Sequence, residues 1–306
     1  MEFVCFTFIV DDIVLPDGQT VMEQLGGGGP QSLFGYQVVS GMRAKVGISA
    51  GVGRDVPASC RRCLSLFSID DSGLIEDAGP RTPRAWQIFE ADGLRTQVWR
   101  GFRDNDPKLT EMLSPKFEDL PPVYRQATNF HLGVHPSVTP STLLEVLRQS
   151  AHRAGGLFTI EPYTSAPTPP PPYHLTSLLS KCDVFSPNEL ELRSLFLSSE
   201  SIKTAQVPQD TSRDGMLFPF RPENSKGENE NEKENANKGA RGHPLTVQLA
   251  LQLLALSPPG GANTVVVRCG ADGVVLVARD PSMAKAANEG PDFNSTAFVC
   301  HVPAVQ

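Results

Sequence analysis

The amino-acid sequence predicts an α/β fold in which helices flank a doubly wound, mostly parallel sheet, with a small β lid attached. Three observations predict this fold. The chain opens on an apolar run typical of a buried strand, strand and helix patterns alternate up to about residue 165, and the same alternation resumes after residue 241. Such alternation is typical of parallel sheets, because each parallel connection has to cross a face of the sheet, usually as a helix.

Composition limits the class of protein. The 306 residues allow one large domain or two ordinary ones, and we expect a single α/β domain over residues 1–306. A formal net charge of −7 leaves no global positive surface for nucleic acid or an anionic membrane, so neither is an expected partner. The apolar runs fall short of the roughly 20 residues of a membrane span. Six cysteines are too few for a disulfide scaffold, which favours a cytoplasmic location, with an organelle interior as the alternative.

The first elements are expected to be a strand, a flap and a helix. Residues 1–10 are apolar and are typical of a buried strand. Short strand patterns over 13–15 and 20–25 surround a polar turn, which predicts small lid strands over residues 12–26. A glycine run followed by Pro30 then favours the start of a helix, because proline is tolerated in the first helical turn.

The remaining elements follow from apolar periodicity and from turn and cap residues. In chain order we expect a helix at 31–42, a strand at 45–50, a helix at 58–66, strands at 84–90 and 94–99, a strand at 129–133, a helix at 141–154 and a strand at 157–161. After a proline-rich loop at 166–172 we expect a strand at 183–186, a helix at 188–197, a helix at 245–256, and strands at 264–268, 274–278 and 297–302.

A polar stretch interrupts this pattern from about residue 198 to residue 241. Residues 229–235 contain no apolar side chain, and a segment that cannot bury apolar surface cannot offset the entropy of its ordering. We therefore expect residues 198–241 to be a disordered insertion within the domain rather than a domain boundary.

Two carboxylates follow the first apolar run. Asp11 and Asp12 are expected at the carboxyl end of a strand, which is where ligands bind in open α/β sheets. A carboxylate in that position can accept two hydrogen bonds from neighbouring hydroxyls of a polyol. The alternative is a solvated turn closed by an Asx hydrogen bond.

Four glycines, Gly26 to Gly29, precede the expected first helix. They let the backbone approach a ligand or act as a hinge, and amides at a helix N-terminus favour anionic or hydroxyl oxygens. A plain flexible loop is the alternative. The run fits no G-x-G-x-x-G register, and the chain has no G-x-x-x-x-G-K-[ST] sequence, so neither a dinucleotide fingerprint nor a P-loop is expected.

Asn188 and Glu191 lie at the start of a helix that follows a short strand. Three residues apart, they share one helical face, and an amide together with a carboxylate can hold a hydrated Mg²⁺ beside phosphates. The alternative is local: Asn188 as the N-cap and Glu191 as its capping-box partner.

Two further patterns have plain alternatives. The glycines of the turn at 269–273 can let an adenine or a ribose lie on the backbone, although a simple hairpin turn has the same composition. Cys60 and Cys63 form a single C-x-x-C pair in a helical stretch. Without a second pair they do not favour metal or redox chemistry.

Taken in order, these segments resemble the ribokinase-like (PfkB) sugar kinase family. The resemblance rests on Val10–Ile13, the short flap, the glycine pair that opens a helix, the run Gly51–Asp55, the P-N-x-x-E sequence from Pro187 to Glu191, and Val266–Gly273 with its G-A-D-G turn. It covers nearly the whole chain outside the insertion.

The resemblance implies a chemistry and a set of acceptor contacts. Members of this family transfer the γ-phosphoryl group of ATP to a hydroxymethyl group of a sugar, nucleoside or similar alcohol. Carried over, Asp11 would bind acceptor hydroxyls, and Gly26 and Gly27 would be the hinge pair beneath the acceptor. A homodimer formed through the lid is a further implication.

The same resemblance implies the cofactors and where they bind. ATP and Mg²⁺ are the expected cofactors. Asn188 and Glu191 would organise Mg²⁺ and phosphate, and Gly270 and Gly273 would border the nucleotide.

Three departures from the family pattern matter. Gln31 stands where the family usually has an Asn that contacts the acceptor, and Arg268 stands two residues before Gly270, where a Thr is common. The family's G-A-G-D motif, which carries the catalytic base and the anion hole, would follow the strand expected at 297–302. We therefore expect the base to lie beyond Gln306, so this chain is assigned no catalytic residue.

The expected function is thus ATP-dependent phosphorylation of a hydroxyl group on a small metabolite, inactive in a chain truncated before the base. A fragment of a longer gene and a short isoform both fit that expectation. The alternative is a non-catalytic kinase relative that binds a ligand or a partner. A NAD-dependent α/β enzyme is disfavoured, because the dinucleotide fingerprint is missing.

Overall fold

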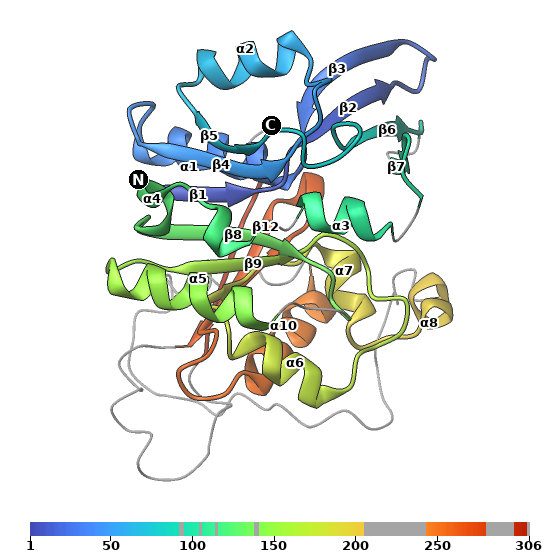
Figure 1. The fold of residues 1–306 in the computed structure, drawn as a ribbon. Helices are drawn as coiled ribbons and strands as arrows, with labels where there is room; N and C mark the ends of the chain where they lie inside the picture. Colours follow the sequence, from blue (N-terminus) through green and yellow to red (C-terminus); the bar gives the residue numbers. More distant parts are fainter. Residues whose placement is uncertain are drawn as a thin grey trace, which may run out of the picture. The chain divides into compact units, whose positions relative to one another are not determined.

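A computed structural model describes residues 1–91, 95–103, 106–113, 116–137, 141–204, 243–279 and 297–304. The chain divides into two compact units. The first comprises Met1–Gly133 and Pro140–Ile160, and the second comprises Val134–Thr139 and Glu161–Gln306. Both units combine strands and helices, so the expected α/β class is confirmed (Figure 1).

The first unit is built on a parallel sheet with the order β9-β8-β1-β4-β5. Its strands are β1 (Phe3–Phe6), β4 (Val46–Gly51), β5 (Asp70–Ile75), β8 (Asn129–Val134) and β9 (Phe158–Pro162). The last residue of β8, Val134, and the last two of β9, Glu161 and Pro162, already belong to the second unit. The central strand β1 pairs in parallel with β4 and with β8, and β4 pairs in parallel with β5. Every residue of β4 is buried, as expected for a parallel strand covered on both faces.

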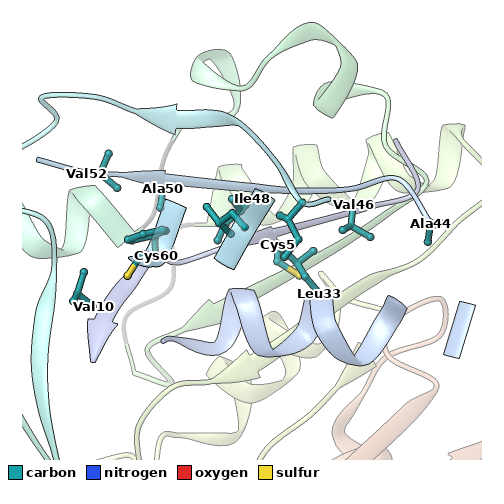
Figure 2. Close-up of a cluster of buried hydrophobic side chains, with 12 residues drawn as sticks. Cys5, Val10, Leu33, Ala44, Val46, Ile48, Ala50, Val52 and Cys60 are labelled. Atoms are coloured by element: carbon teal, nitrogen blue, oxygen red, sulfur yellow. The ribbon is translucent and has the colours of Figure 1, made fainter. Parts of the chain in front are cut away.

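Helices connect these strands. They are α1 (Gly28–Ser40), α2 (Ala58–Leu66), α3 (Pro107–Leu113), α4 (Pro122–Arg125) and α5 (Ser141–Arg153), with a 3₁₀ turn η1 (Phe117–Asp119). A cluster of buried apolar side chains fixes α1 and α2 to the sheet. Leu33 of α1 and Cys60 of α2 belong to one cluster with Cys5 of β1 and Ile48 of β4, and all four are fully buried (Figure 2). Full burial of a large apolar side chain stabilises the fold by about 1.5–3 kcal/mol.

A second, smaller sheet also belongs to the first unit. Its order is β3-β2-β6-β7, with β2 (Ile9–Val14), β3 (Thr20–Gly26), β6 (Arg84–Phe89) and β7 (Arg95–Trp99). The outer pairs are antiparallel, whereas β2 and β6 pair in parallel. The expected flap and the strand pair expected at 84–90 and 94–99 are therefore parts of one four-stranded sheet, which we call the small sheet.

The strand expected over residues 1–10 is in fact two strands. Thr7 has a φ of 86°, a left-handed conformation that a threonine rarely adopts, and the strand breaks there. As a result β1 joins the parallel sheet while β2 joins the small sheet. The break matters for the site, because Asp11 lies within β2 rather than at the carboxyl end of β1.

The second unit has four strands in the order β13-β12-β11-β10. They are β10 (Val184–Phe185), β11 (Thr264–Arg268), β12 (Val274–Arg279) and β13 (Ala297–Val302), joined by the 3₁₀ turn η2 (Gly270–Asp272) between β11 and β12. The pair β10–β11 is parallel, and β11–β12 and β12–β13 are antiparallel. Its helices are α6 (Pro172–Leu179), α7 (Glu189–Ser194), α8 (Ser199–Thr204) and α10 (Pro244–Leu256).

Most expected elements are present within a few residues. The helices and strands that were not expected are β5, α3, α4, α6 and α8, and the 3₁₀ turns η1 and η2 were not expected either. Within the range expected to be a disordered insertion, residues 199–204 form α8, and residues 205–242 lie outside the described part of the chain. None of the helices in the described segments has both the length and the apolar character needed to cross a membrane.

Tyr124 of α4 packs the edge of the parallel sheet. Its side chain is fully buried, and the ring occupies the space beside Gly47 of β4 and Gly73 of β5, where an added Cβ would overlap it. The Tyr124 hydroxyl donates to the backbone carbonyl of Asp70 at 2.6 Å. The two glycines therefore make room for one aromatic ring, which anchors α4 on β5.

We expect Tyr124→Phe to lower the free energy of unfolding by about 1–3 kcal/mol, because the ring remains while the hydroxyl that bonds Asp70 is lost. Urea unfolding monitored by circular dichroism would measure this change. Tyr173→Phe is the matched control, since the Tyr173 side chain is 77% exposed and its hydroxyl loss should stay within about 0.5 kcal/mol. Equal effects of the two substitutions would contradict the anchoring role.

Candidate functional site

Asp11 is the carboxylate of the first unit best placed for a ligand. It lies in β2 and is only partly buried, and its Oδ1 accepts a hydrogen bond of 2.9 Å from Nε2 of Gln87 on β6. Burial raises the pKa of Asp11 above its usual value, and this effect outweighs the hydrogen bond from Gln87 and the field of Arg95. One hydrogen bond leaves a carboxylate with further acceptor positions, so Asp11 retains capacity for hydroxyl groups.

Gly26 ends β3 directly against Asp11. An added Cβ on Gly26 would overlap the carboxyl group of Asp11, so a glycine is required for that carboxylate to keep its position. Gly27 has a φ of 92° and is the N-cap of α1, which is a backbone conformation that favours glycine. A Cβ on Gly29 would overlap the backbone carbonyls of Phe6 and Thr7. The run is thus an ordered turn with close backbone approaches, and the alternative of a plain flexible loop is wrong.

Gln31 lies in the first turn of α1 and is exposed. Among the residues that the structure describes, no group binds its amide. The side chain can therefore contact a molecule bound next to the glycine turn.

Asp12 plays a different part from its neighbour. Its side chain is fully buried, and Arg84 of β6 binds it with both ends of the guanidinium, Nε at 2.6 Å from Oδ2 and Nη2 at 2.8 Å from Oδ1. Arg100 also donates to Oδ2, and the backbone N–H of Glu23 donates to Oδ1 at 3.0 Å. Burial alone would raise the pKa of Asp12, but these donors outweigh it and lower the pKa to about 2. Asp12 is therefore an ionised structural group with its acceptors filled.

The partners of Asp12 were missed from the sequence. Arg84 begins β6, and Arg100 follows β7 with its guanidinium 4.7 Å from the centre of the Trp86 ring. The sequence does show one arginine at the start of the strand pair expected at 84–99 and one directly after its end. It does not show that this strand pair lies next to Asp11 and Asp12, because sequence patterns do not tell which strands pair.

The run Gly51–Asp55 ties the larger sheet of the first unit to the start of β6. The backbone N–H of Gly53 donates to Oγ1 of Thr82 at 3.1 Å, and the backbone N–H of Thr82 donates to Oδ1 of Asp55 at 2.6 Å. A Cβ on Gly53 would lie 2.6 Å from the backbone of Arg81 and Thr82. This loop therefore sets the starting point of the strand that carries Gln87.

Cys60 and Cys63 do not form a reactive pair. Both are free thiols, and Cys60 is fully buried in the core cluster, with its Sγ 3.5 Å from the carbonyl of Glu23. Burial raises the pKa of Cys60 to about 11 and also raises the pKa of Cys63. Thiols held in the protonated form are poor nucleophiles and poor metal ligands, in line with the sequence expectation.

In the second unit, Asn188 and Glu191 form a capping box at the start of α7. The Glu191 backbone N–H donates to Oδ1 of Asn188 at 2.8 Å, and the Asn188 backbone N–H donates to Oε2 of Glu191 at 2.7 Å. The local alternative considered for this pair is thus present. A capping box does not exclude a further role, because each carboxylate oxygen has two lone pairs.

Glu191 is also part of a charged group. Arg268 of β11 places Nη1 at 2.7 Å from Oε2 of Glu161 and Nη2 at 3.3 Å from Oε2 of Glu191. Burial raises the pKa of Glu191 to about 7; the Glu161 charge adds to this, while the Asn188 N–H and Arg268 oppose it. Glu161 was missed from the sequence, where it appeared only as the end of an apolar strand.

The arrangement fits Mg²⁺ poorly. Oε2 of Glu191 already accepts hydrogen bonds from the Asn188 backbone N–H and from Arg268, and burial raises the pKa of the carboxyl group, which weakens it as a metal ligand. No cluster of three His, Cys, Asp or Glu side chains in the described residues could hold a metal ion. The Arg268 guanidinium already forms ion pairs with Glu161 and Glu191, the carboxylates that a metal ion would bind.

Gly270 and Gly273 shape a tight turn between β11 and β12. Gly270 has a φ of 58°, and the space around a Cβ added there is open. Gly273 has a φ of 96°, and a Cβ there would overlap the carbonyl of Val302 on β13. Gly273 is thus required by packing, whereas Gly270 leaves an open backbone that a flat ring can approach.

No protein-family model matches the chain. An uncharacterized protein of Schizosaccharomyces pombe is 26% identical over 198 residues, which is 61% of this chain and 50% of that protein. The chain thus spans about half the length of the curated relative it matches.

Solved structures of sugar kinases share the fold. A putative ribokinase II from E. coli has a TM-score of 0.56 at 14% identity, over 99% of this chain and 79% of that chain. A fructokinase with bound ATP from Xylella fastidiosa has a TM-score of 0.56 at 15% identity, over 91% and 71%. A ribokinase from Giardia lamblia has a TM-score of 0.51 at 17% identity, over 90% and 71%. The protein therefore has the ribokinase-like α/β fold, as the sequence resemblance implied.

We expect Gly26→Ala to lower the free energy of unfolding by about 1–3 kcal/mol, because the new methyl group displaces the Asp11 carboxylate. Gly35→Ala is the control: Gly35 lies within α1 with open space around it, so alanine there should stabilise by about 0.5–1 kcal/mol. Urea unfolding of both variants, and of Gly26→Ala in an Asp11→Ala background, would measure the effects. An undiminished penalty in that background would show that Asp11 is not the cause.

The pH dependence of stability reports on Asp12. Its pKa is about 2 in the folded protein, against 3.8 for a free aspartate. The ionised form therefore stabilises the fold by about 2 kcal/mol above pH 4. This contribution is lost as the pH falls from 4 to 2. Asp12→Asn should therefore be markedly less stable than the parent at pH 6, with a smaller gap at pH 2.5. Asp17→Asn, at an exposed turn, should show no such change. A difference in stability between Asp12→Asn and the parent that does not change with pH would contradict the ionised state of Asp12.

Proposed function

We propose that the protein binds ATP and a small hydroxylated metabolite, a sugar or a nucleoside, and that its chemistry is phosphorylation of a hydroxyl group. The observation that carries the proposal is the partly buried Asp11 carboxylate, held by Gln87 and Gly26 with acceptor positions left over, in a chain with the ribokinase-like fold. The similarity of the fold to a fructokinase with bound ATP and to a ribokinase supports the choice of substrates.

The proposed roles follow from residue chemistry. Asp11 accepts hydrogen bonds from two neighbouring hydroxyls, and Gln31 adds an amide beside the glycine turn of Gly26 and Gly27. In the second unit, the open backbone at Gly270 lies along the nucleotide. The acceptor oxygen attacks the γ-phosphorus, the bond to the bridging oxygen breaks, ADP leaves, and the hydroxyl proton passes to a base.

A homodimer through the small sheet belongs to the same proposal. Both outer strands of the small sheet expose apolar side chains, since Val21 and Met22 of β3 and Val98 of β7 are each 40–45% exposed. We place the protein in the cytoplasm.

The second candidate is a ligand-binding relative of the kinases without turnover. It is favoured by one observation: Arg268 forms ion pairs with Glu161 and Glu191. Glu191 is one of the two residues that the family resemblance assigns to Mg²⁺. Phosphoryl transfer depends on cations that neutralise the developing charge, so a protein without that metal binds ligands more readily than it turns them over.

Substitution of Asp11 tests the acceptor assignment. Calorimetric titration of the protein with a panel of pentoses, hexoses and nucleosides should identify a ligand whose Kd rises at least about 100-fold in Asp11→Ala, since two charge-assisted hydrogen bonds of about 1.5–3 kcal/mol each are removed. Asp17→Ala, on the exposed turn of the same sheet, is the matched control and should bind like the parent.

A panel ligand that binds Asp11→Ala as tightly as the parent would refute the acceptor assignment, and binding of none of the panel would refute the substrate class. ATP consumption in the presence of the bound ligand then separates the two candidates. Acceptor-dependent ADP release supports the kinase, and binding without release supports the non-catalytic relative.

A further inference from the structure

Two buried carboxylates of the second unit share one guanidinium. The Glu161 and Glu191 side chains are 11% and 8% exposed, and Arg268 reaches both, at 2.7 Å and 3.3 Å. The Arg268 side chain is 42% exposed as a whole, but its Nε is buried without a hydrogen-bond partner among the described residues. Each acid comes from a different element, Glu161 from β9 and Glu191 from α7.

The backbone holds this arrangement in place. The Arg268 N–H donates to the Pro187 carbonyl at 3.0 Å, and a β-bridge links Asn188 to Arg268. The capping box fixes Glu191 at the same time. The end of β11 is therefore fixed to the start of α7 by backbone hydrogen bonds. These bonds help to hold the Arg268 guanidinium near Glu191, although the arginine side chain itself is flexible.

Charge explains why a cation is needed there. Two buried carboxylates repel each other and lose hydration, so they are compatible only if one is protonated or a cation lies between them. Arginine supplies a permanent charge and a planar fork that matches carboxylate oxygens. A divalent ion with its waters would satisfy the same pair, because Mg²⁺ and Mn²⁺ prefer carboxylate oxygens and need only one or two of them.

We propose that Arg268 is the resident cation of the Glu161–Glu191 pair and that it excludes divalent metal ions from this site. The two carboxylates form a latent metal site that opens only when the guanidinium is removed. The longer contact, between Arg268 and Glu191, is the one that an entering ion would break first, while the shorter contact anchors Arg268 on Glu161. The proposal concerns binding of a cation and does not depend on phosphoryl transfer.

Manganese is a suitable probe, because Mn²⁺ shares the ligand preference of Mg²⁺ and its binding is measured directly by electron paramagnetic resonance. On the 306-residue protein without nucleotide, Arg268→Ala should bind one Mn²⁺ at least about ten times more tightly than the parent. Adding Glu191→Gln to that variant should remove the gain. Arg54→Ala is the matched control, since it removes the same charge from an exposed ion pair with Asp77 and should bind Mn²⁺ like the parent.

The parent protein gives a second test that does not require the Arg268 variant to fold. Because the guanidinium already fills the pair, Glu191→Gln alone should leave Mn²⁺ binding of the parent unchanged. A parent site whose Mn²⁺ affinity falls in Glu191→Gln would overturn the proposal. So would a folded Arg268→Ala protein, judged by circular dichroism, that binds Mn²⁺ no better than the parent.

Discussion

The small sheet depends on the ion pairs and hydrogen bonds of one buried carboxylate, that of Asp12. An unpaired charge in that position would be strongly destabilising, and the bidentate Arg84 together with Arg100 and the Glu23 N–H compensates it. These donors come from three parts of the small sheet and its flanks, so one side chain holds β2, β3 and β6 in register. Arg84 and Arg100 both bind Asp12, so its neighbour Asp11 has the Gln87 amide as its hydrogen-bond partner, and burial raises the pKa of Asp11 despite the field of Arg95.

Two adjacent residues with the same side chain thus have opposite roles, and strand geometry separates them. Successive side chains of a strand point to opposite faces. The parallel register places Asp11 beside Ala85 and Asp12 beside Trp86, so Asp11 meets Gln87 on one face while Asp12 meets Arg84 on the other. A structural acid and the acid proposed to bind a ligand can therefore stand side by side without sharing partners.

Sequence reasoning predicted what is local and missed what is distant. The helix at Ala58–Leu66 and the strands at Thr264–Arg268 and Ala297–Val302 have the expected bounds, because apolar periodicity and turn residues determine them. The capping box at Asn188 also follows from spacing. The break at Thr7 did not, since no propensity places a threonine at positive φ.

Contacts between residues far apart in sequence were missed for a related reason. The Asp12–Arg84 and Arg268–Glu191 pairs are separated by 72 and 77 residues, and only the pairing of strands brings them together. The resemblance to the ribokinase-like family showed that Arg268 replaces a common Thr, but it did not predict the contacts of Arg268. Its partner Glu161 carries no signal in the sequence, because a single acid at the end of an apolar strand is common.

The contact between Gly26 and Asp11 has a consequence for how this protein can change over evolutionary time. Any side chain larger than hydrogen at position 26 collides with the carboxylate, while loss of the carboxylate removes the reason for the glycine. The two positions are therefore expected to change together: a lineage that loses the acid can vary both, and a lineage that keeps it can vary neither. A glycine retained at 26 without an acid at 11 would mark a descendant that had only recently lost the carboxylate.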